Sequence, residues 1–320
     1  MCIFGYFGTE LLLYPSKAMI QGIADSGFGV VRIPVAWSNL MARDYTINPA
    51  LLDRVEQIIL WVLESDMDAI VNIHWDGGWF KNFSSDFDGT MAKYTAVWDQ
   101  LCAYYEPYGE RLMFEGLNEE LHWDEIWTEW MADQSGKPRA LGIANRINQA
   151  FVDLVRGSGG NNQQRHLLIP SYSTSISLAC DPLFVMPTDP AGRMAISVHY
   201  YTPSTFAILE KDADWGKART TWGTDADWAE LRSEMGKMKT HYIDEGIPVI
   251  VGEFGSSTKN KTSEMVRYYL SSVAQEPWVR GLCPVLWDVT DVFYLRRKQT
   301  FKDPLLLEAL MAVKELPRDL

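Results

Sequence analysis

Cysteine and positive charge are both scarce in this sequence of 320 residues. The four cysteines, Cys2, Cys102, Cys180 and Cys283, are scattered without a CxxC pair, so neither a zinc site nor a disulfide framework is indicated. The 29 lysines and arginines are outnumbered by 42 aspartates and glutamates, which gives a net charge of −13. Such a chain is poorly suited to binding nucleic acid or an anionic membrane, and a neutral substrate is favoured.

Several other signals are missing. The N-terminus has no basic segment followed by a sustained apolar run, and Leu11–Leu13 is too short for a signal peptide or a membrane span. No phosphate-binding glycine loop and no cluster with the spacing of metal ligands is present, so we expect neither a cofactor nor a metal ion. No low-complexity linker divides the chain, which predicts a single domain over residues 1–320. We also expect the protein to be a monomer.

Aromatic residues, in contrast, are abundant, with 13 Trp, 14 Tyr and 13 Phe. Several tryptophans lie beside Gly, Asn or His in apparent loops, where a flat ring can stack on a sugar. Seven are candidate sugar-stacking residues: Trp37, Trp75, Trp79, Trp123, Trp127, Trp215 and Trp222. We expect roughly half of these seven to contact substrate and the others to pack loops.

Short apolar runs recur along the chain and are separated by helical patterns. They cover Val30–Pro34, Ala69–His74, Arg111–Glu119, His166–Ser171, Ala195–Tyr201, Pro248–Phe254 and Leu282–Asp288. Near-continuous apolar runs are typical of parallel strands that are buried on both faces. With Cys2–Phe7 as an eighth strand, the pattern predicts a (β/α)8 TIM barrel, and a doubly wound open sheet is the alternative.

Most of these runs carry a polar or catalytic type of side chain at or near the C-terminal end. These side chains are Arg32, His74, Asn118, Glu119, His199, Tyr201, Glu253 and Trp287. The C-terminal ends of barrel strands meet on one face, so residues far apart in the sequence are expected to line one pocket.

Glycoside hydrolysis requires two carboxyl groups of this kind, a protonated acid and an anionic group facing the anomeric carbon. We expect Glu253 to stay ionised through Arg32 and Tyr201, and the pKa of Glu119 to be raised by partial burial and by the opposite negative charge. Asp76 is an alternative pocket carboxylate. Strand alternation predicts that Glu120 points away from the face that Glu119 uses.

Six short motifs follow one another along the chain: VRIPV, NIHWDGGW, FEGLNEE, SVHYYTP, VIVGEFG and PVLWD. With these motifs in this order, the chain resembles glycoside hydrolase family 5, the large cellulase family. The resemblance implies a retaining mechanism with Glu119 as acid/base and Glu253 as nucleophile. The segments YTPSTFA and TTWGT look like subfamily 4, which implies endo-action on the β-1,4 bonds of cellulose-type glucan, mixed-linkage β-glucan or xyloglucan.

The resemblance also implies supporting roles for six side chains around the bond that breaks: Arg32, His74, Asn118, His199, Tyr201 and Trp287. The sequence departs from the family pattern at three places. It opens with MCIFGYFGTE in place of a GxNxGN-like segment, it has Glu120 where a proline usually follows the acid/base, and it has Trp75 where many relatives have a second histidine. We expect the protein to be secreted, with its signal peptide removed from this chain.

Two other functions are compatible with the same residues. A β-mannanase or a narrow xyloglucanase on the same barrel would need no change of catalytic group. A non-catalytic carbohydrate-binding protein could use the aromatic rings alone, but it would not need an ionised glutamate flanked by Arg, Tyr and His.

Overall fold

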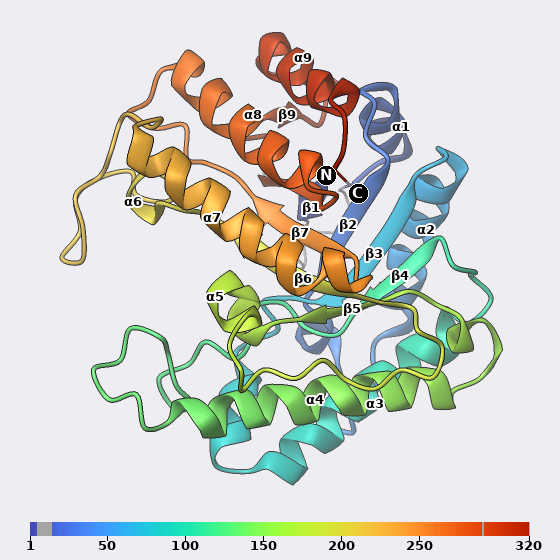
Figure 1. Ribbon diagram of the computed structural model, residues 1–320. Helices are drawn as coiled ribbons and strands as arrows, with labels where there is room; N and C mark the ends of the chain where they lie inside the picture. The colour runs from blue at the N-terminus through green and yellow to red at the C-terminus, as the bar shows by residue number, and fades with distance from the viewer. Residues whose placement is uncertain (5–14, 290, 320) are drawn as a thin grey trace.

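Eight parallel strands close into a barrel in the computed structural model, which describes residues 1–4, 15–289 and 291–319 (Figure 1). The strands are β1 (Cys2–Phe4), β2 (Val30–Val35), β3 (Asp68–Ile73), β4 (Leu112–Glu115), β5 (Leu167–Pro170), β6 (Met194–Tyr200), β7 (Val249–Phe254) and β8 (Cys283–Val289). Each strand pairs with the next in chain order, and β8 pairs with β1. The closed sheet confirms the TIM barrel and decides against the open doubly wound alternative.

The N-terminal strand was the least marked of the eight in the sequence. Its Cys2 pairs with Arg32 of β2 on one side and with Trp287 of β8 on the other. The prediction of a strand over Cys2–Phe7 is therefore confirmed for Cys2–Phe4, and residues 5–7 lie outside the described part of the chain.

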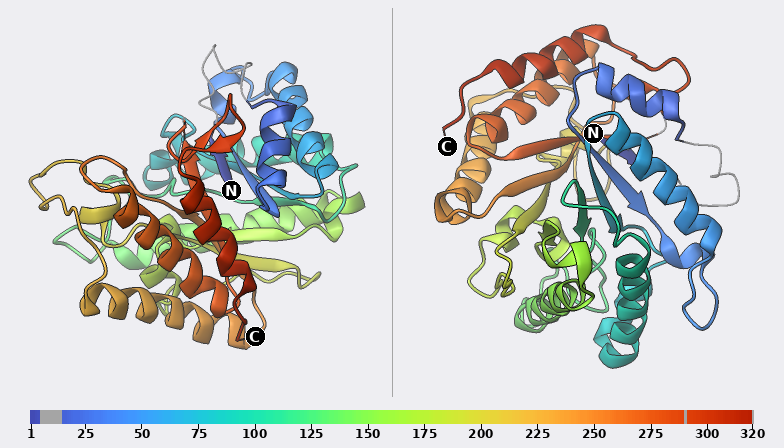
Figure 2. Two further views of the ribbon diagram at one scale, coloured as in Figure 1. Left: turned by 90° about the horizontal axis from the view of Figure 1, so that it is seen from above. Right: turned by 90° about the vertical axis from the view of Figure 1, so that its right-hand side faces the viewer.

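Helices surround the strands on the outside of the barrel, as the right-hand view of Figure 2 shows. They are α1 (Lys17–Asp25), α2 (Pro49–Glu64), α3 (Phe87–Tyr104), α4 (Lys137–Gly157), α5 (Ile176–Ala179), α6 (Ser204–Ala207), α7 (Asp225–His241), α8 (Ser263–Val279) and α9 (Pro304–Ala312). The start of α2 follows from its sequence, since Asn48 accepts a hydrogen bond from the Ala50 amide and Pro49 occupies the first helical position. A short antiparallel pair, β9 (Tyr294–Leu295) and β10 (Thr300–Phe301), precedes α9.

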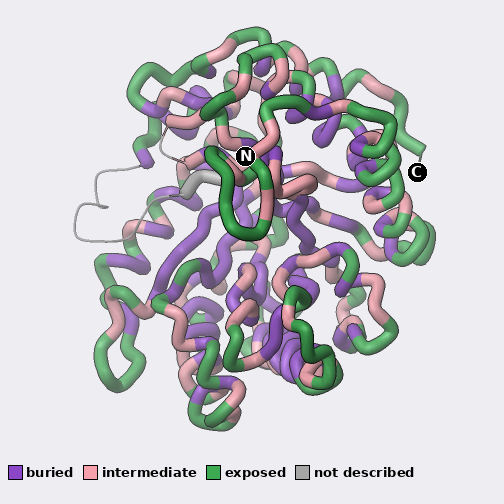
Figure 3. Tube along the Cα trace, turned by 90° about the vertical axis from the view of Figure 1, so that its left-hand side faces the viewer, coloured by how far each residue is buried: buried purple, intermediate pink, exposed green. Residues whose placement is uncertain are grey.

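The barrel strands are mostly buried, whereas the outer helix faces and the loops carry the exposed residues (Figure 3). This burial explains why the strands appear in the sequence as apolar runs without alternation. Cys102, Cys180 and Cys283 are free thiols. Among the described residues no helix is long and apolar enough to cross a membrane.

Two local features at the C-terminal ends of the strands differ from a regular sheet. The predicted strand Arg111–Glu119 is shorter in the structure, because β4 ends at Glu115 and residues 116–120 form a loop. The β6–β7 ladder shifts register between Val198 and His199, directly before the pair His199–Glu253. Such irregularities re-aim side chains next to active sites, and the pair His199–Glu253 directly follows this one.

Candidate active site

The guanidinium group of Arg32 on β2 organises the carboxyl-lined centre of the barrel mouth. It is fully buried and donates hydrogen bonds from Nε to Glu115 Oε2 at 2.6 Å, from Nη1 to Glu253 Oε1 at 2.7 Å and from Nη2 to Asn118 Oδ1 at 2.9 Å. A planar guanidinium holds its partners in a fixed fork. Arg32 thus fixes Glu253 and Asn118 relative to one another.

Glu115 at the end of β4 contacts the candidate site residue Arg32 and is not among the residues selected from the sequence. Besides Arg32, its carboxylate accepts hydrogen bonds from Asn72 Nδ2 at 2.9 Å and from Ser197 Oγ at 2.6 Å. It has no exposed surface, and a buried charge needs such partners. The available signal was a glutamate inside the apolar run LMFE, where only a partnered charge is tolerated.

Glu253 at the end of β7 lies among four polar partners. Tyr201 Oη donates to its Oε2 at 2.9 Å, and His199 Nδ1 and His74 Nδ1 lie 3.7 and 3.9 Å from its carboxylate oxygens. Burial raises the pKa of Glu253, while the positive charges of His199 and Arg32 and the hydrogen bond from Tyr201 oppose that rise. The contacts expected from Arg32 and Tyr201 are present, but burial raises the pKa of Glu253 by more than these contacts lower it.

Glu119 lies in the loop after β4, and its side chain is 42% exposed. Its Oε1 is hydrogen bonded to His199 Nδ1 at 2.6 Å, and Thr174 Oγ1 donates to the same oxygen at 3.4 Å. Burial raises the pKa of Glu119, but the hydrogen bond and charge of His199, aided by Arg32, outweigh it and leave the pKa below its usual range. The expected rise in the pKa of Glu119 is therefore wrong, because the contact between His199 and Glu119 cannot be read from the sequence.

The two carboxylates face each other across a short gap. One oxygen of Glu119, one of Glu253 and a ring nitrogen of His199 all lie within 4.8 Å of one another. This spacing agrees with the roughly 5 Å of a retaining glycoside hydrolase and is shorter than the roughly 6.5 to 9.5 Å that inversion needs. The same three side chains could also ligate a cation, so the expected absence of a metal ion remains a prediction.

His74 and Trp287 form the wall next to Glu253. Their rings are stacked with centroids 5.5 Å apart and an interplanar angle of 13°. Burial, together with the charges of Arg32 and His199, lowers the pKa of His74 well below its usual value. His74 is thus a neutral imidazole beside the carboxylate.

The assignment as a sugar-stacking residue is wrong for three of the seven candidate tryptophans, because these three are buried in the protein. Trp37 is fully buried and donates through Nε1 to Asn72 O at 2.9 Å. Trp127 packs against Tyr172, and Trp222 packs in a cluster with Tyr269 and its neighbours on α7 and α8. A ring that is covered by protein on both faces has no surface left for a sugar.

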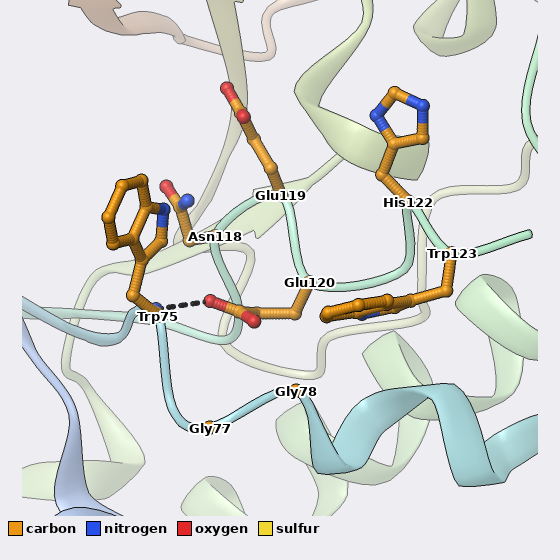
Figure 4. Close-up of a pocket in the computed structure, with 8 residues that line it drawn as sticks. All are labelled: Trp75, Gly77, Gly78, Asn118, Glu119, Glu120, His122 and Trp123. Carbon is orange, nitrogen blue, oxygen red and sulfur yellow. Dashed lines mark hydrogen bonds between the residues drawn. The ribbon is translucent and has the colours of Figure 1, made fainter.

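The other four tryptophans keep exposed surface. Trp75 is 65% exposed and, with Trp123, lines a pocket of about 450 Å³ beside Glu119 (Figure 4). Trp79 is half-buried, stacks on Phe80 and donates from Nε1 to Asp76 at 2.9 Å. Trp215 is 61% exposed in the long connection between α6 and α7.

Two further carboxyl groups, those of Asp76 and Glu120, lie at or near the pocket that Trp75 and Trp123 line. Asp76 is fully buried and accepts from the Ser38 amide and from Trp79, so it holds the loop and does not face the cleft centre. The side chains of Glu119 and Glu120 run in different directions (Figure 4), but the predicted strand alternation is wrong, since both residues lie in a loop and not on a strand. Glu120 still lines the same pocket, which the sequence did not indicate.

Comparison with known families agrees with this geometry. The sequence model of the family described as Cellulase (glycosyl hydrolase family 5) matches residues 3–291. The chain belongs to glycosyl hydrolase family 5. The resemblance drawn from the six motifs is thereby confirmed.

Individual family 5 proteins resemble the chain over most of its length. The chain is 34% identical over 278 residues to the cellulase/esterase CelE of Acetivibrio thermocellus. This match covers 85% of the chain and 32% of CelE. It is 31% identical over 292 residues to a xyloglucan-specific endo-β-1,4-glucanase of Bacteroides ovatus, covering 86% of this chain and 57% of the relative. The chain therefore spans about a third of the length of the first relative and somewhat more than half of the second.

A solved family 5 structure extends the likeness to three dimensions. The GH5-4 broad specificity endoglucanase from an uncultured bovine rumen ciliate superposes with a TM-score of 0.85 at 28% identity. The match covers 98% of this chain and 92% of that chain. The family 5 barrel is thus shared over nearly the whole molecule.

Proposed function

We propose that this family 5 chain is a retaining endo-β-1,4-glucanase. The observation that carries the proposal is the pair of carboxylates, with one oxygen of Glu119 and one of Glu253 within 4.8 Å, held by Arg32, Tyr201 and His199. Two carboxyl groups at this spacing serve a double displacement, in which one attacks the sugar and the other transfers protons.

In the first step Glu253 attacks the anomeric carbon while Glu119 protonates the oxygen of the leaving glucan, so the glycosidic bond breaks and a glycosyl–enzyme ester forms. In the second step Glu119 removes a proton from water, which attacks the same carbon and releases Glu253. Arg32 and Tyr201 stabilise the carboxylate that departs from the ester. A sugar ring over the site excludes water from Glu119, which strengthens the burial effect that raises its pKa.

Asn118 is suited to bind the sugar beside the nucleophile. Arg32 has no acceptor, so the amide atom that receives its hydrogen bond at 2.9 Å must be the oxygen of Asn118. The amide nitrogen of Asn118, on the other side of the amide group, is then available as a hydrogen-bond donor. A hydrogen bond from this nitrogen to the 2-hydroxyl group, as the resemblance implies, is compatible with that orientation.

The proposed substrates are cellulose-type glucan, mixed-linkage β-glucan and xyloglucan. The xyloglucan-specific relative from Bacteroides ovatus and the broad specificity endoglucanase from the rumen ciliate support this range. The acidic chain also favours a neutral polysaccharide. Secretion, a monomeric state, the single catalytic domain over residues 1–320 and the absence of nucleic-acid and membrane partners stay predictions.

A substrate panel and product stereochemistry test the proposal. Carboxymethylcellulose, lichenan, xyloglucan and mannan are incubated with the protein and with Glu253→Ala, and reducing ends are measured. We expect release from the glucans and none from the variant, and NMR of the first product should show the retained β-anomer. Cleavage of mannan alone would establish the β-mannanase, binding without any release would establish the carbohydrate-binding protein, and an inverted first product would refute the mechanism.

A further inference from the structure

The two departures from the family pattern at Trp75 and Glu120 meet in the structure. The backbone amide of Trp75 donates to Glu120 Oε1 at 2.5 Å, across 45 residues of sequence. Trp75 has a φ of 48°, in the left-handed region that a bulky residue rarely adopts without support. The carboxyl group of Glu120 gives that support, and Trp75 is held with its ring 65% exposed.

Glu120 itself is held as a neutral acid. It is buried, and burial together with the nearby charges of Asp76 and Glu119 raises its pKa to about 8 against the hydrogen bond from Trp75. Burial also raises the pKa of Asp76, but hydrogen bonds from Trp79 Nε1 at 2.9 Å and from the Ser38 amide at 2.6 Å oppose that rise. At neutral pH Glu120 therefore carries a hydroxyl group that can donate to a sugar oxygen.

The opposite wall of the pocket is fixed by a close approach of backbone and ring. Gly78 has a φ of 69°, and a Cβ added there would lie 2.9 Å from two ring carbons of Trp123. The ring of Trp123 can pack against the loop only because this position is glycine. Figure 4 shows the carboxyl group of Glu120 between Trp75 on one side and Trp123 on the other.

The pocket lies on one side of the carboxylate pair. Glu119 and Asn118 line it, together with Glu120 and His122. Glu119 is the residue that must reach the oxygen of the leaving group. A pocket that begins at Glu119 is therefore placed to hold a unit that is attached through that oxygen.

From these contacts we infer that Trp75, Glu120 and Trp123 form a binding subsite for a pyranose unit on the leaving-group side of the scissile bond, with Glu120 as the residue that positions Trp75. The inference rests on the proposed glucanase function. The bound unit is either the next backbone glucose or a branch sugar attached to it, and both present an apolar ring face and hydroxyl groups. Trp75 supplies the stacking surface, and the Glu120 hydroxyl group donates a hydrogen bond.

The test compares substrates with and without a sugar on the leaving-group side. Steady-state kinetics are measured on cellopentaose, on a xyloglucan oligosaccharide and on 2,4-dinitrophenyl β-cellobioside, whose aryl leaving group needs no sugar subsite. For Trp75→Ala we expect kcat/KM on at least one oligosaccharide to fall about tenfold or more, with the aryl substrate within about twofold of the unmodified protein. A loss on cellopentaose identifies backbone glucose as the occupant, and a loss on the xyloglucan oligosaccharide alone identifies a branch sugar.

Variants of Glu120 separate positioning from general structure. Glu120→Ala removes the acceptor for the Trp75 amide and should reproduce the substrate pattern of Trp75→Ala. Glu120→Gln keeps an amide oxygen at that place and should restore most of the lost kcat/KM. Trp61→Ala, which removes a partly exposed tryptophan from the outer helix α2, should leave all three substrates unchanged.

Three results would overturn the inference: unchanged kinetics of Trp75→Ala on both oligosaccharides, an equal loss on the aryl substrate, or no rescue by Glu120→Gln over Glu120→Ala. Circular dichroism and the melting temperature of each variant verify that it is folded, and Trp75→Ala tests the subsite even if a Glu120 variant does not fold. Failure of the proposed function is distinguishable, because the unmodified protein would then hydrolyse none of the three substrates.

Discussion

Arg32 Nη1 donates to Glu253 Oε1 at 2.7 Å, although the two residues are 221 positions apart in the sequence. The same guanidinium reaches Glu115 and Asn118, so one cation on β2 connects side chains from β4, the loop after β4 and β7. A preorganised group of this kind needs no rearrangement when charge moves from Glu253 to the substrate and back.

Glu119→Gln should separate the two chemical roles of the carboxylates. Loss of the proton donor is expected to lower kcat/KM on polysaccharide by about 10² to 10⁴-fold. Hydrolysis of 2,4-dinitrophenyl β-cellobioside should still form the glycosyl–enzyme, since its leaving group needs no proton, and a burst of dinitrophenol would show this. Equal losses on both substrates would assign Glu119 a different role.

Tyr201→Phe should weaken the nucleophile without removing it. The phenol donates to Glu253 Oε2 at 2.9 Å and lowers the pKa of that carboxyl group. A hydrogen bond to a charged group contributes about 1.5 to 3 kcal/mol, so we expect kcat to fall about 10- to 100-fold. Because the pKa of Glu253 should then rise, the acid limb of the pH–kcat/KM profile should move to higher pH, and an unmoved limb would contradict this.

Arg32→Met should destabilise the fold as well as abolish activity. It leaves the carboxylates of Glu115 and Glu253 buried without their cation, which costs about 3 to 5 kcal/mol. Arg111→Met is the matched control, since its pair with Asp68 is 44% and 47% exposed and is worth at most about 1 kcal/mol. Urea unfolding followed by tryptophan fluorescence gives both values, and similar losses would refute the argument.

Glu120→Gln should change how stability depends on pH. The pKa of Glu120 rises from 4.5 to about 8 on folding, so between these values the unfolded chain releases a proton that the folded protein keeps. Stability contributed by the protonated acid is therefore lost as pH rises from about 4.5 to about 8. Glutamine does not titrate. Between pH 5 and pH 8 the free energy of unfolding of the variant should therefore fall less than that of the unmodified protein, by about 1 kcal/mol or more. Parallel pH curves for both proteins would contradict the prediction.

The local sequence was sufficient to predict where the strands lie, because a strand that is buried on both faces must be apolar along its length. It was also sufficient to select Glu253, which follows such a strand at the mouth of the barrel. Seven strands were predicted to within a few residues. The larger error is at Arg111–Glu119, because the sequence pattern does not show that β4 ends at Glu115 and that a loop follows.

Trp37 and Trp75 show why single side chains were harder to place. Both are candidates for sugar stacking in the sequence, yet one is fully buried and the other is 65% exposed. Burial of a loop residue depends on which distant segments cover it, and a tryptophan has the same local character in either place. Glu115 was missed for the same reason, since its partners Arg32, Asn72 and Ser197 come from three other strands.

The sequence by itself determined the barrel, the order of its strands and the identity of the family, because these follow from the periodicity of apolar residues and from short motifs. Only the tertiary structure decided that His199 contacts Glu119, that Glu115 holds Arg32, and that Glu120 supports Trp75. These contacts join residues 45 to 83 positions apart, and the pKa values of Glu119 and Glu120 depend on them. Charge and burial at the site are thus properties of the closed barrel, which brings its strand ends together.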